Sequence, residues 1–193
     1  MEQGRQVERA RQASQGGYGT YGVAIGIPDP HGAELADWRK RLGDPNAGAI
    51  PPHVTLLPPT RLPRRSLPAV IDHLCGLAEE HRGFDIHLRG SGTFRPVSPV
   101  VFVPLVEGIS DCERLERAVR SGPLARQTRF NYHPHVTVGH DLPDDVLDHA
   151  FETLTAFEAR FRVDAFSLFE QGDDEVWRPL RDFPLGRSGR ERS

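Results

Sequence analysis

Hydrophobic positions along the chain fall into strand-like and helix-like segments that alternate. Apolar runs and two-residue alternation predict strands over residues 20–27, 84–90, 99–106, 161–169 and 176–183, and two more that begin at His53 and His135. Apolar residues spaced three or four apart predict helices over residues 31–42, 64–81, 110–122 and 143–158. Between the last two strands, the turn-forming residues 171–174 predict a tight hairpin.

The same order of elements occurs twice. Elements that begin near residues 20, 31, 53, 64 and 84 recur near 99, 110, 135, 143 and 161, an offset of 77–82 residues each time. This duplication predicts an α+β fold of two β-α-β-α-β lobes, about 18–98 and 99–185, related by a pseudo-twofold axis. We expect antiparallel sheets that flank a central cleft, with the helices outside.

Polar segments mark both ends of the chain. Residues 1–17 contain almost no apolar side chain, which predicts a disordered N-terminal extension, and residues 186–193 predict a flexible tail. These ends contribute to the low hydrophobic content of 37% and the mean hydropathy of −0.48. Residues 18–185 are then expected to form a single bilobal domain.

Charge and cysteine content exclude several classes of function. The net charge of −3 gives no general basic field for nucleic acid, so contact with RNA should be local. Cys75 and Cys112 have no metal or redox spacing and should be reduced. No apolar stretch approaches membrane-spanning length, and residues 1–17 lack the apolar segment of a signal peptide. We therefore expect a cytoplasmic protein without membrane contact.

The sequence Pro-His-Val-Thr occurs at residues 52–55 and again at 134–137. Composition alone predicts only about 0.4 His-x-Thr triplets in this chain, and both copies share the same Pro and Val. On a strand, His53 and Thr55 share one face, as do His135 and Thr137. Two such strands facing one cleft present two imidazoles and two hydroxyls, a set that suits acid–base chemistry on a phosphodiester.

Paired His-x-Thr motifs in a duplicated α/β chain resemble the 2H phosphoesterase superfamily. Within it, the chain is most similar to the bacterial branch called 2′–5′ RNA ligase or RNA 2′,3′-cyclic phosphodiesterase. The segments that carry the resemblance are residues 52–57, the Gly-Thr-Phe of residues 92–94 ahead of the apolar strand 100–105, and residues 132–137. The resemblance covers about residues 18–183.

The resemblance implies a phosphodiesterase in which His53 and His135 act as general acid and base, with their roles left open. Thr55 and Thr137 would bind the non-bridging phosphate oxygens. It implies no metal, ATP or other cofactor. The expected substrate is an RNA end with a cyclic phosphate or a small cyclic nucleotide, with reversible 2′–5′ RNA ligation as a second activity. A monomer is expected, because the duplication already supplies an internal symmetry.

Three more residues are candidates for substrate binding. Phe94 and Tyr132 have aromatic rings that suit stacking on an unpaired base, although ordinary packing explains either of them as well. Arg129 precedes the second motif by six residues and is placed to contact phosphate.

Two alternative functions stay open at this point. His133, His135 and His140 are close in sequence, and with His53 they suggest a histidine-based metal hydrolase. The chain also fits a non-catalytic protein that binds RNA ends or nucleotides and keeps the same pocket. Measurable turnover that is lost on replacing a motif histidine would exclude the second alternative.

Overall fold

The computed structural model describes residues 17–127 and 131–186. The sequence predictions for residues 1–16, for 187–193 and for Arg129 lie outside these ranges. Nine strands are present: β1 Tyr18–Gly26, β2 His53–Pro63, β3 Phe84–Arg89, β4 Gly92–Thr93, β5 Val100–Glu107, β6 His135–His140, β7 Glu158–Val163, β8 Ala165–Gln171 and β9 Trp177–Pro184. The helices are α2 His31–Arg41, α3 Leu67–Glu80, α4 Ile109–Val119 and α5 Asp144–Thr153, with single 3-10 turns at Arg64–Ser66, Gly122–Leu124 and Leu154–Ala156.

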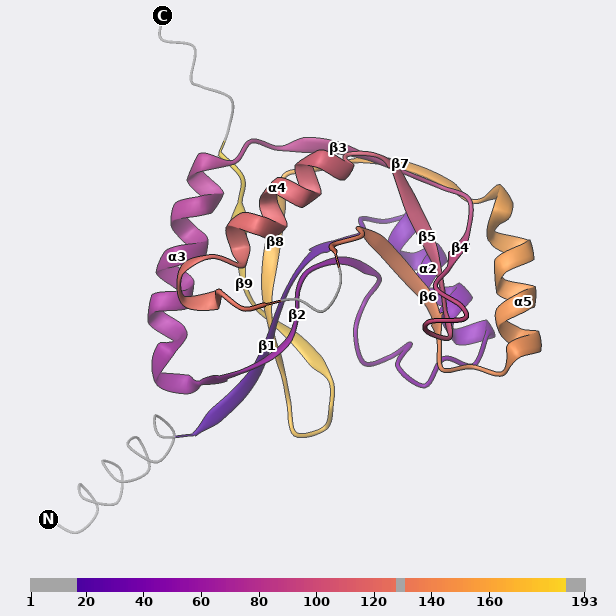
Figure 1. The fold of residues 1–193 in the computed structure, drawn as a ribbon, viewed down its shortest axis with the longest axis horizontal. Helices are drawn as coiled ribbons and strands as arrows, with labels where there is room; N and C mark the ends of the chain where they lie inside the picture. Colours follow the sequence, from indigo (N-terminus) through magenta and orange to yellow (C-terminus); the bar gives the residue numbers. More distant parts are fainter. Residues whose placement is uncertain (1–16, 128–130, 187–193) are drawn as a thin grey trace, which may run out of the picture.

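All strands belong to one curved antiparallel sheet. Its order is β7-β3-β5-β6-β2-β1-β8-β9, and the short β4 pairs with β5 outside this path. The helices lie around the outside of the sheet, while β2 and β6, which carry the two motifs, meet in the middle (Figure 1). The predicted α+β class, with antiparallel sheets about a centre and helices outside, is confirmed.

Each half of the sheet contains strands from both halves of the chain. β3 pairs with β5 and β7 of the second half, and the β8–β9 hairpin attaches to β1 of the first half. By position in the sheet, β3 therefore corresponds to β8, and β7 to β9. The predicted strand over 161–169, which the spacing matched to the segment at 84, spans parts of β7 and β8, and only its β8 part lies at the position that corresponds to β3.

The single strand predicted over residues 161–169 was wrong, since the structure has two strands there. Along β7 the buried side chains include Ala159 and Val163, but in β8 they include Phe166 and Leu168. The two-residue alternation thus changes phase at Asp164, which lies between the strands. The phase change lets β7 pair with β3 while β8 crosses to β1.

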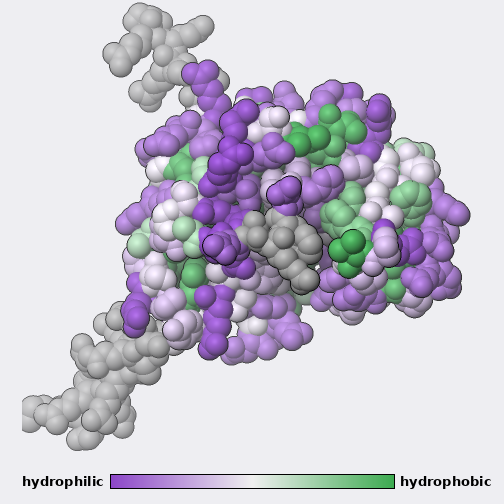
Figure 2. All heavy atoms as spheres, viewed as in Figure 1, coloured by the Kyte–Doolittle hydropathy of each residue, from purple (hydrophilic) through white to green (hydrophobic). Residues whose placement is uncertain are grey.

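Apolar side chains from both halves fill one continuous core. Val54 and Val136, the central residues of the motifs, are fully buried, as are Leu74 of α3 and Leu115 of α4. Hydrophilic side chains predominate on the face shown in Figure 2. None of the helices in residues 17–127 and 131–186 combines the length and apolar character needed to cross a bilayer.

Candidate active site

The two motif strands meet through one backbone pairing, in which Val54 of β2 faces Val136 of β6 in an antiparallel arrangement. Continuing this register by one residue places His53 opposite Thr137, and Thr55 opposite His135. Directly opposed residues have Cβ atoms about 4.5–5.5 Å apart. Because the buried valines point into the core, the two histidines and two threonines share the other face of the sheet. All four are partly exposed there.

Each of the two histidines is held by a hydrogen bond of the same type, from its ring to a backbone carbonyl two residues before it. The Nδ1 of His53 lies 2.8 Å from the carbonyl oxygen of Pro51, and the Nδ1 of His135 lies 2.7 Å from that of His133. A carbonyl oxygen only accepts, so each Nδ1 carries the proton and each Nε2 is left to react. The residue between carbonyl and histidine is a proline in both copies, Pro52 and Pro134, and its fixed φ restricts this short turn. The repeated Pro therefore has a geometric role beside each histidine.

The surroundings of both histidines favour the neutral imidazole. Burial lowers the pKa of His53, and the positive charges of Arg39 and His135 lower it further, while the bond to Pro51 acts in the opposite direction. Burial also lowers the pKa of His135, helped by His133. A neutral imidazole with a free Nε2 is the form that removes a proton.

Two cavities open on the motif face and meet at Thr55. One, of about 180 Å³, lies on the His53 side and is lined by residues of β1, β2, β8 and β9. The other, of about 700 Å³, lies on the His135 side and is lined by Phe94 and Tyr132 among others. Thr137 belongs to the lining of neither cavity.

A model of the 2′-5′ RNA ligase superfamily matches residues 27–175, which include both motifs. The chain belongs to this superfamily. The resemblance to 2H phosphoesterases inferred from the paired motifs is thereby confirmed.

Two bacterial proteins are similar to this chain over most of its length. "Putative phosphoesterase BH1439" of Halalkalibacterium halodurans is 30% identical over 169 residues, which cover 86% of this chain and 98% of the relative. "Putative phosphoesterase BLi01284/BL02661" of Bacillus licheniformis is 29% identical over 168 residues, with the same coverage of 86% and 98%. Superfamily membership and these relatives support a phosphoesterase of the 2H type.

Two solved structures share the fold. Apo LigT of E. coli superposes with a TM-score of 0.62 at 21% identity, over 88% of this chain and 99% of LigT. TT0787 of Thermus thermophilus superposes with a TM-score of 0.59 at 22% identity, over 88% of this chain and all of TT0787.

Phe94 and Tyr132, the aromatic residues that the sequence suggested for substrate binding, lie on the His135 side of the motif face. The ring of Phe94 is 4.9 Å from the imidazole of His135 in an edge-to-face arrangement, and Phe102 of β5 is 5.0 Å from it on a tilted plane. The hydroxyl of Tyr132 donates to the carbonyl of Thr55 at 2.9 Å, which ties the segment before β6 to β2. Both predicted aromatic residues thus line the larger cavity, and Tyr132 also holds the motif strands together.

The sequence did not point to Arg39, which orders the segment that leads to His53. Arg39 is 5% exposed, and its guanidinium donates to the Asp44 carboxylate at 2.8 Å and to the carbonyls of Asn46 and Ile50 at 2.8 and 2.6 Å. Its position in the last turn of α2 resembles that of any exposed basic residue, so the sequence carried no signal for its burial.

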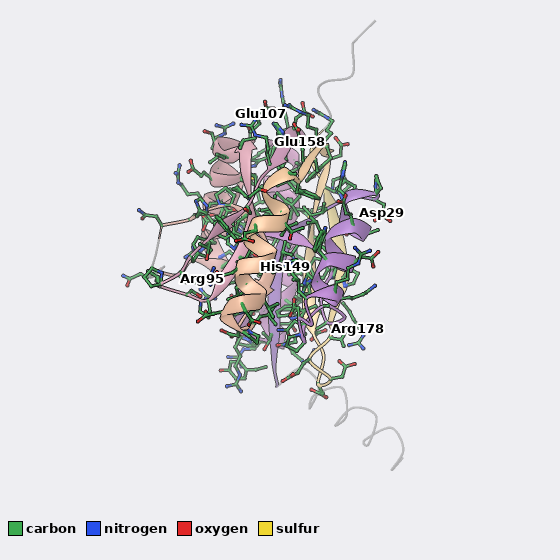
Figure 3. All side chains as sticks on the ribbon, turned by 90° about the vertical axis from the view of Figure 1, so that its right-hand side faces the viewer. Asp29, Arg95, Glu107, His149, Glu158 and Arg178 are labelled. Carbon is green, nitrogen blue, oxygen red and sulfur yellow. The ribbon has the colours of Figure 1, made fainter. Side chains whose placement is uncertain are left out.

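The structure also places one charged and one aromatic residue for which the sequence indicated no position relative to the site. Arg95 forms ion pairs with Asp148 at 2.6 Å and Asp144 at 3.7 Å, so it binds α5 (Figure 3). Trp177 of β9 lines the smaller cavity, although it lies more than a hundred residues from the first motif. Only the pairing of β8–β9 with β1 brings it there, and the sequence repeat did not indicate that pairing.

The histidines of the metal-site alternative are unequally placed. The rings of His133 and His135 lie 6.1 Å apart and nearly parallel, while His140 is exposed and faces Asp141 at 3.4 Å. Within residues 17–127 and 131–186, no group of three or more His, Cys, Asp or Glu side chains is arranged to hold a metal ion.

Proposed function

We propose that this protein is a metal-independent phosphodiesterase that hydrolyses 2′,3′-cyclic phosphates and that also joins them reversibly to a 5′-hydroxyl, forming a 2′–5′ bond. One observation carries the proposal: the β2–β6 register sets each motif histidine opposite the other motif's threonine, on one open face. A phosphate seated there meets an imidazole on each side. Crystal structures of E. coli LigT contain 3′-AMP and phosphate, ligands compatible with this chemistry.

In the proposed reaction, the neutral Nε2 of one histidine removes a proton from water as the water oxygen attacks phosphorus. The bond from phosphorus to one ribose oxygen breaks, and the protonated Nε2 of the other histidine gives that oxygen its proton. Thr55 and Thr137 donate to the non-bridging oxygens as negative charge increases on them. The two histidines end with exchanged protonation states, which solvent restores.

Ligation uses the same arrangement with a different nucleophile. A 5′-hydroxyl takes the place of water, its proton passes to the basic histidine, and the bond to the departing ribose oxygen is replaced by a 2′–5′ linkage. No nucleotide cofactor enters, because the strained cyclic ester supplies the driving force. The substrates that we propose are an RNA end with a cyclic phosphate and small cyclic nucleotides, within the cytoplasm.

The test is turnover of adenosine 2′,3′-cyclic monophosphate, and of an RNA oligomer with a cyclic end, in the presence of EDTA. We expect hydrolysis by the wild-type protein and a loss of roughly 10²–10⁴-fold in kcat for His53→Ala and for His135→Ala. His149→Ala is a matched control, since His149 is exposed on α5. Resolving the 2′- and 3′-phosphate products shows which ribose oxygen departs.

Three outcomes would count against the proposal. Activity that survives either motif substitution would contradict the two-histidine mechanism. Activity lost to EDTA and restored by zinc would favour the metal hydrolase. Nucleotide binding without turnover on either substrate would favour the non-catalytic binding protein.

A further inference from the structure

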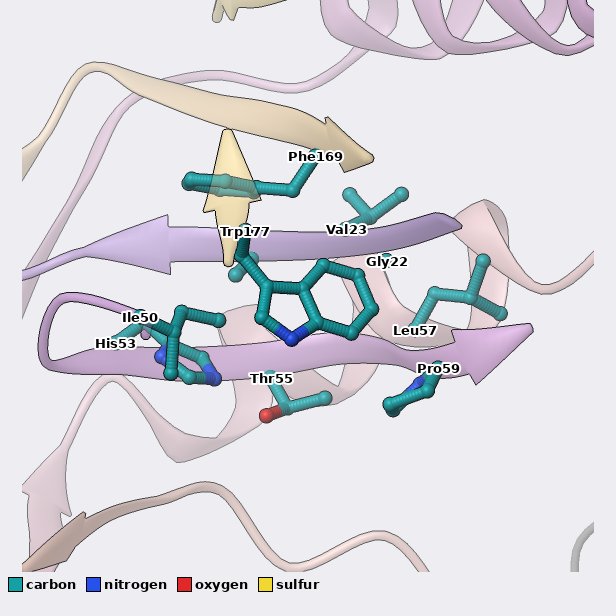
Figure 4. A pocket seen from close by; sticks show the side chains of 10 residues that line it. Gly22, Val23, Ile50, His53, Thr55, Leu57, Pro59, Phe169 and Trp177 are labelled. Atoms are coloured by element: carbon teal, nitrogen blue, oxygen red, sulfur yellow. The ribbon is translucent and has the colours of Figure 1, made fainter. Parts of the chain in front are cut away.

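The smaller cavity, here called the Trp177 slot, is a built apolar site next to His53. Its lining residues are Gly22, Val23, Ala24, Ile50, His53, Thr55, Leu57, Pro59, Phe169 and Trp177. The indole of Trp177 lies over the sheet with His53 on one side and Leu57 on the other (Figure 4). Apart from the indole N–H, the polar side chains in this lining are those of His53 and Thr55, which the proposed reaction assigns to the phosphate.

Gly22 of β1 leaves the space that the indole occupies. A Cβ at this position would lie 3.2 Å from Cζ3 of Trp177 and 3.3 Å from the carbonyl oxygen of Leu57. The backbone is extended there, so the absence of a side chain serves close approach by the ring and not an unusual backbone conformation. Phe169 faces Gly22 in the β1–β8 register and adds a second aromatic ring.

The far wall of the slot is fixed to the segment that carries His53. The backbone N–H of Trp177 donates to the carbonyl of Ala49 at 2.8 Å, and the next residue, Ile50, lines the slot. The carbonyl of Ile50 accepts from Arg39 at 2.6 Å. The indole, the slot wall and the catalytic imidazole are therefore held by one segment, so a ligand in the slot has a defined position relative to His53.

The size and chemistry of the slot define its ligand. Its volume of about 180 Å³ is below the roughly 300–1,000 Å³ of pockets for drug-sized molecules, so it suits one flat ring system and not a whole nucleotide. The larger cavity on the His135 side differs, because it is lined by Glu116, Arg120 and Asn131. Aromatic rings line both cavities, but the slot on the His53 side is the smaller one, and its described lining has no acidic, basic or amide side chain apart from His53.

We propose that the Trp177 slot binds the nucleobase of the nucleoside that carries the scissile phosphate, by stacking on the indole without reading the base edge. This inference rests on the proposed phosphodiesterase function and adds its substrate class: nucleotides of any base, in preference to phosphodiesters that lack one. Every base has a π-face, so a stacking site tolerates all four. Purines should bind more tightly than pyrimidines, because they offer the larger face.

Fluorescence of Trp177 tests base binding without relying on turnover. The chain has two tryptophans, and Trp38 lies on α2, outside the lining of both cavities. In a Trp38→Phe protein, all indole emission comes from Trp177. We expect adenosine 3′-monophosphate and uridine 3′-monophosphate to quench this emission in a saturable way, the adenosine compound more tightly. Inorganic phosphate should compete with both nucleotides and cause no quenching by itself.

Kinetics with cyclic nucleotides give a second, independent measurement. Stacking that is equal in the ground and transition states affects KM and not kcat. We therefore expect Trp177→Ala to raise KM about 10-fold with little change in kcat, and Trp177→Phe to restore most of the affinity. Gly22→Ala, which moves the indole, should raise KM in the same direction.

The failure of this inference and the failure of the proposed function give different results. Turnover that depends on His53 and His135, together with unchanged Trp177 emission and unchanged KM in Trp177→Ala, would overturn the slot alone. Absence of both turnover and nucleotide binding would overturn the function and the slot together. A strict preference for one base among the four would overturn the claim that the base edge is not read.

Discussion

At the scale of single residues, the motif alternates between the two faces of a strand. Val54 and Val136 are fully buried and fix the strands to the core, while each histidine and threonine stands on the open face. The sequence predicted this alternation because the period of a strand is two. Which groups hold the imidazoles was not predictable, since the acceptors are backbone carbonyls, which every residue has.

Replacing Thr55 by Val tests the proposed phosphate ligand with little change of shape. If the hydroxyl donates to a non-bridging oxygen in the transition state, kcat/KM should fall by about 10²–10³-fold. Thr55→Ser keeps the hydroxyl and should retain most activity. Steady-state kinetics on a cyclic nucleotide, with thermal unfolding as a check on folding, measure both. Equal losses for Val and Ser would assign Thr55 to packing.

The lowered pKa values of the two histidines predict a pH profile. The reaction needs one neutral and one protonated imidazole, so kcat/KM should follow a bell set by the two macroscopic pKa values of the pair in the free enzyme. Both shifts are downward from 6.5, mainly because of burial. Activity should therefore decline as the pH rises above 6.5, when the acid loses its proton.

Measuring kcat/KM between about pH 4.5 and pH 8 checks this profile, with the substrate phosphate singly charged throughout. An alkaline limb centred above about pH 7 would contradict the expected direction of the shifts. The effect of pH on kcat alone is a separate quantity, because it reports the complex and not the free enzyme.

At the scale of elements, the segment between α2 and β2 is organised by one buried ion pair. The side chains of Arg39 and Asp44 are 6% and 1% exposed and meet at 2.8 Å. Removing one partner leaves the other charge buried, so we expect Arg39→Met to lower the free energy of unfolding by about 3–5 kcal/mol. Denaturant unfolding measures this change. Arg39→Met combined with Asp44→Leu should recover part of the loss, and no recovery would mean that the carbonyl bonds dominate.

Arg39→Met should also affect catalysis through His53. The positive charge of Arg39 lowers the pKa of His53, so its removal should raise that pKa and move the pH profile of kcat/KM upward. Arg39→Lys keeps the charge and should leave the profile nearly in place. A profile that is unchanged in Arg39→Met would show that the guanidinium charge does not reach the imidazole.

The sequence largely predicted which helices and strands exist, but it predicted their boundaries less well. Helical spacing located α2, α3, α4 and α5, but the predicted helix over 64–81 begins at Leu67 after a 3-10 turn. The predicted helix over 143–158 was too long, because the chain turns after Thr153 and is already a strand at Glu158. The β7–β8 break was visible in principle as a phase change of the buried side chains at Asp164. β4 was missed because two residues carry no periodicity.

At the scale of the whole molecule, the crossing of β3 and of β8–β9 joins the two halves of the chain. β3 has both of its partners, β5 and β7, in the second half, and β1 pairs with β8. Sequence spacing revealed the duplication but not this exchange, since pairing partners depend on long-range packing and not on local pattern.

The exchange predicts that unfolding is a single cooperative transition, because neither half of the chain completes its own sheet. Far-UV circular dichroism and tryptophan emission should give coincident denaturation curves, since Trp38 lies in α2 and Trp177 in β9. Separated transitions would mean that two units fold independently. A Trp38→Phe protein, which reports on β9 alone, should give the same midpoint as circular dichroism.

The matching carbonyl bonds to His53 and His135 have a consequence for the regiochemistry of the proposed reaction. Neither imidazole is built as a dedicated donor or acceptor of protons, because both have the same tautomer and the same anchoring two residues upstream. In the proposed reaction either imidazole can therefore serve as acid or base, and the unequal walls around the pair would decide which isomer is released. Under this proposal, substitutions in a wall could change which ribose oxygen keeps the phosphate, while the two histidines and two threonines stay where they are.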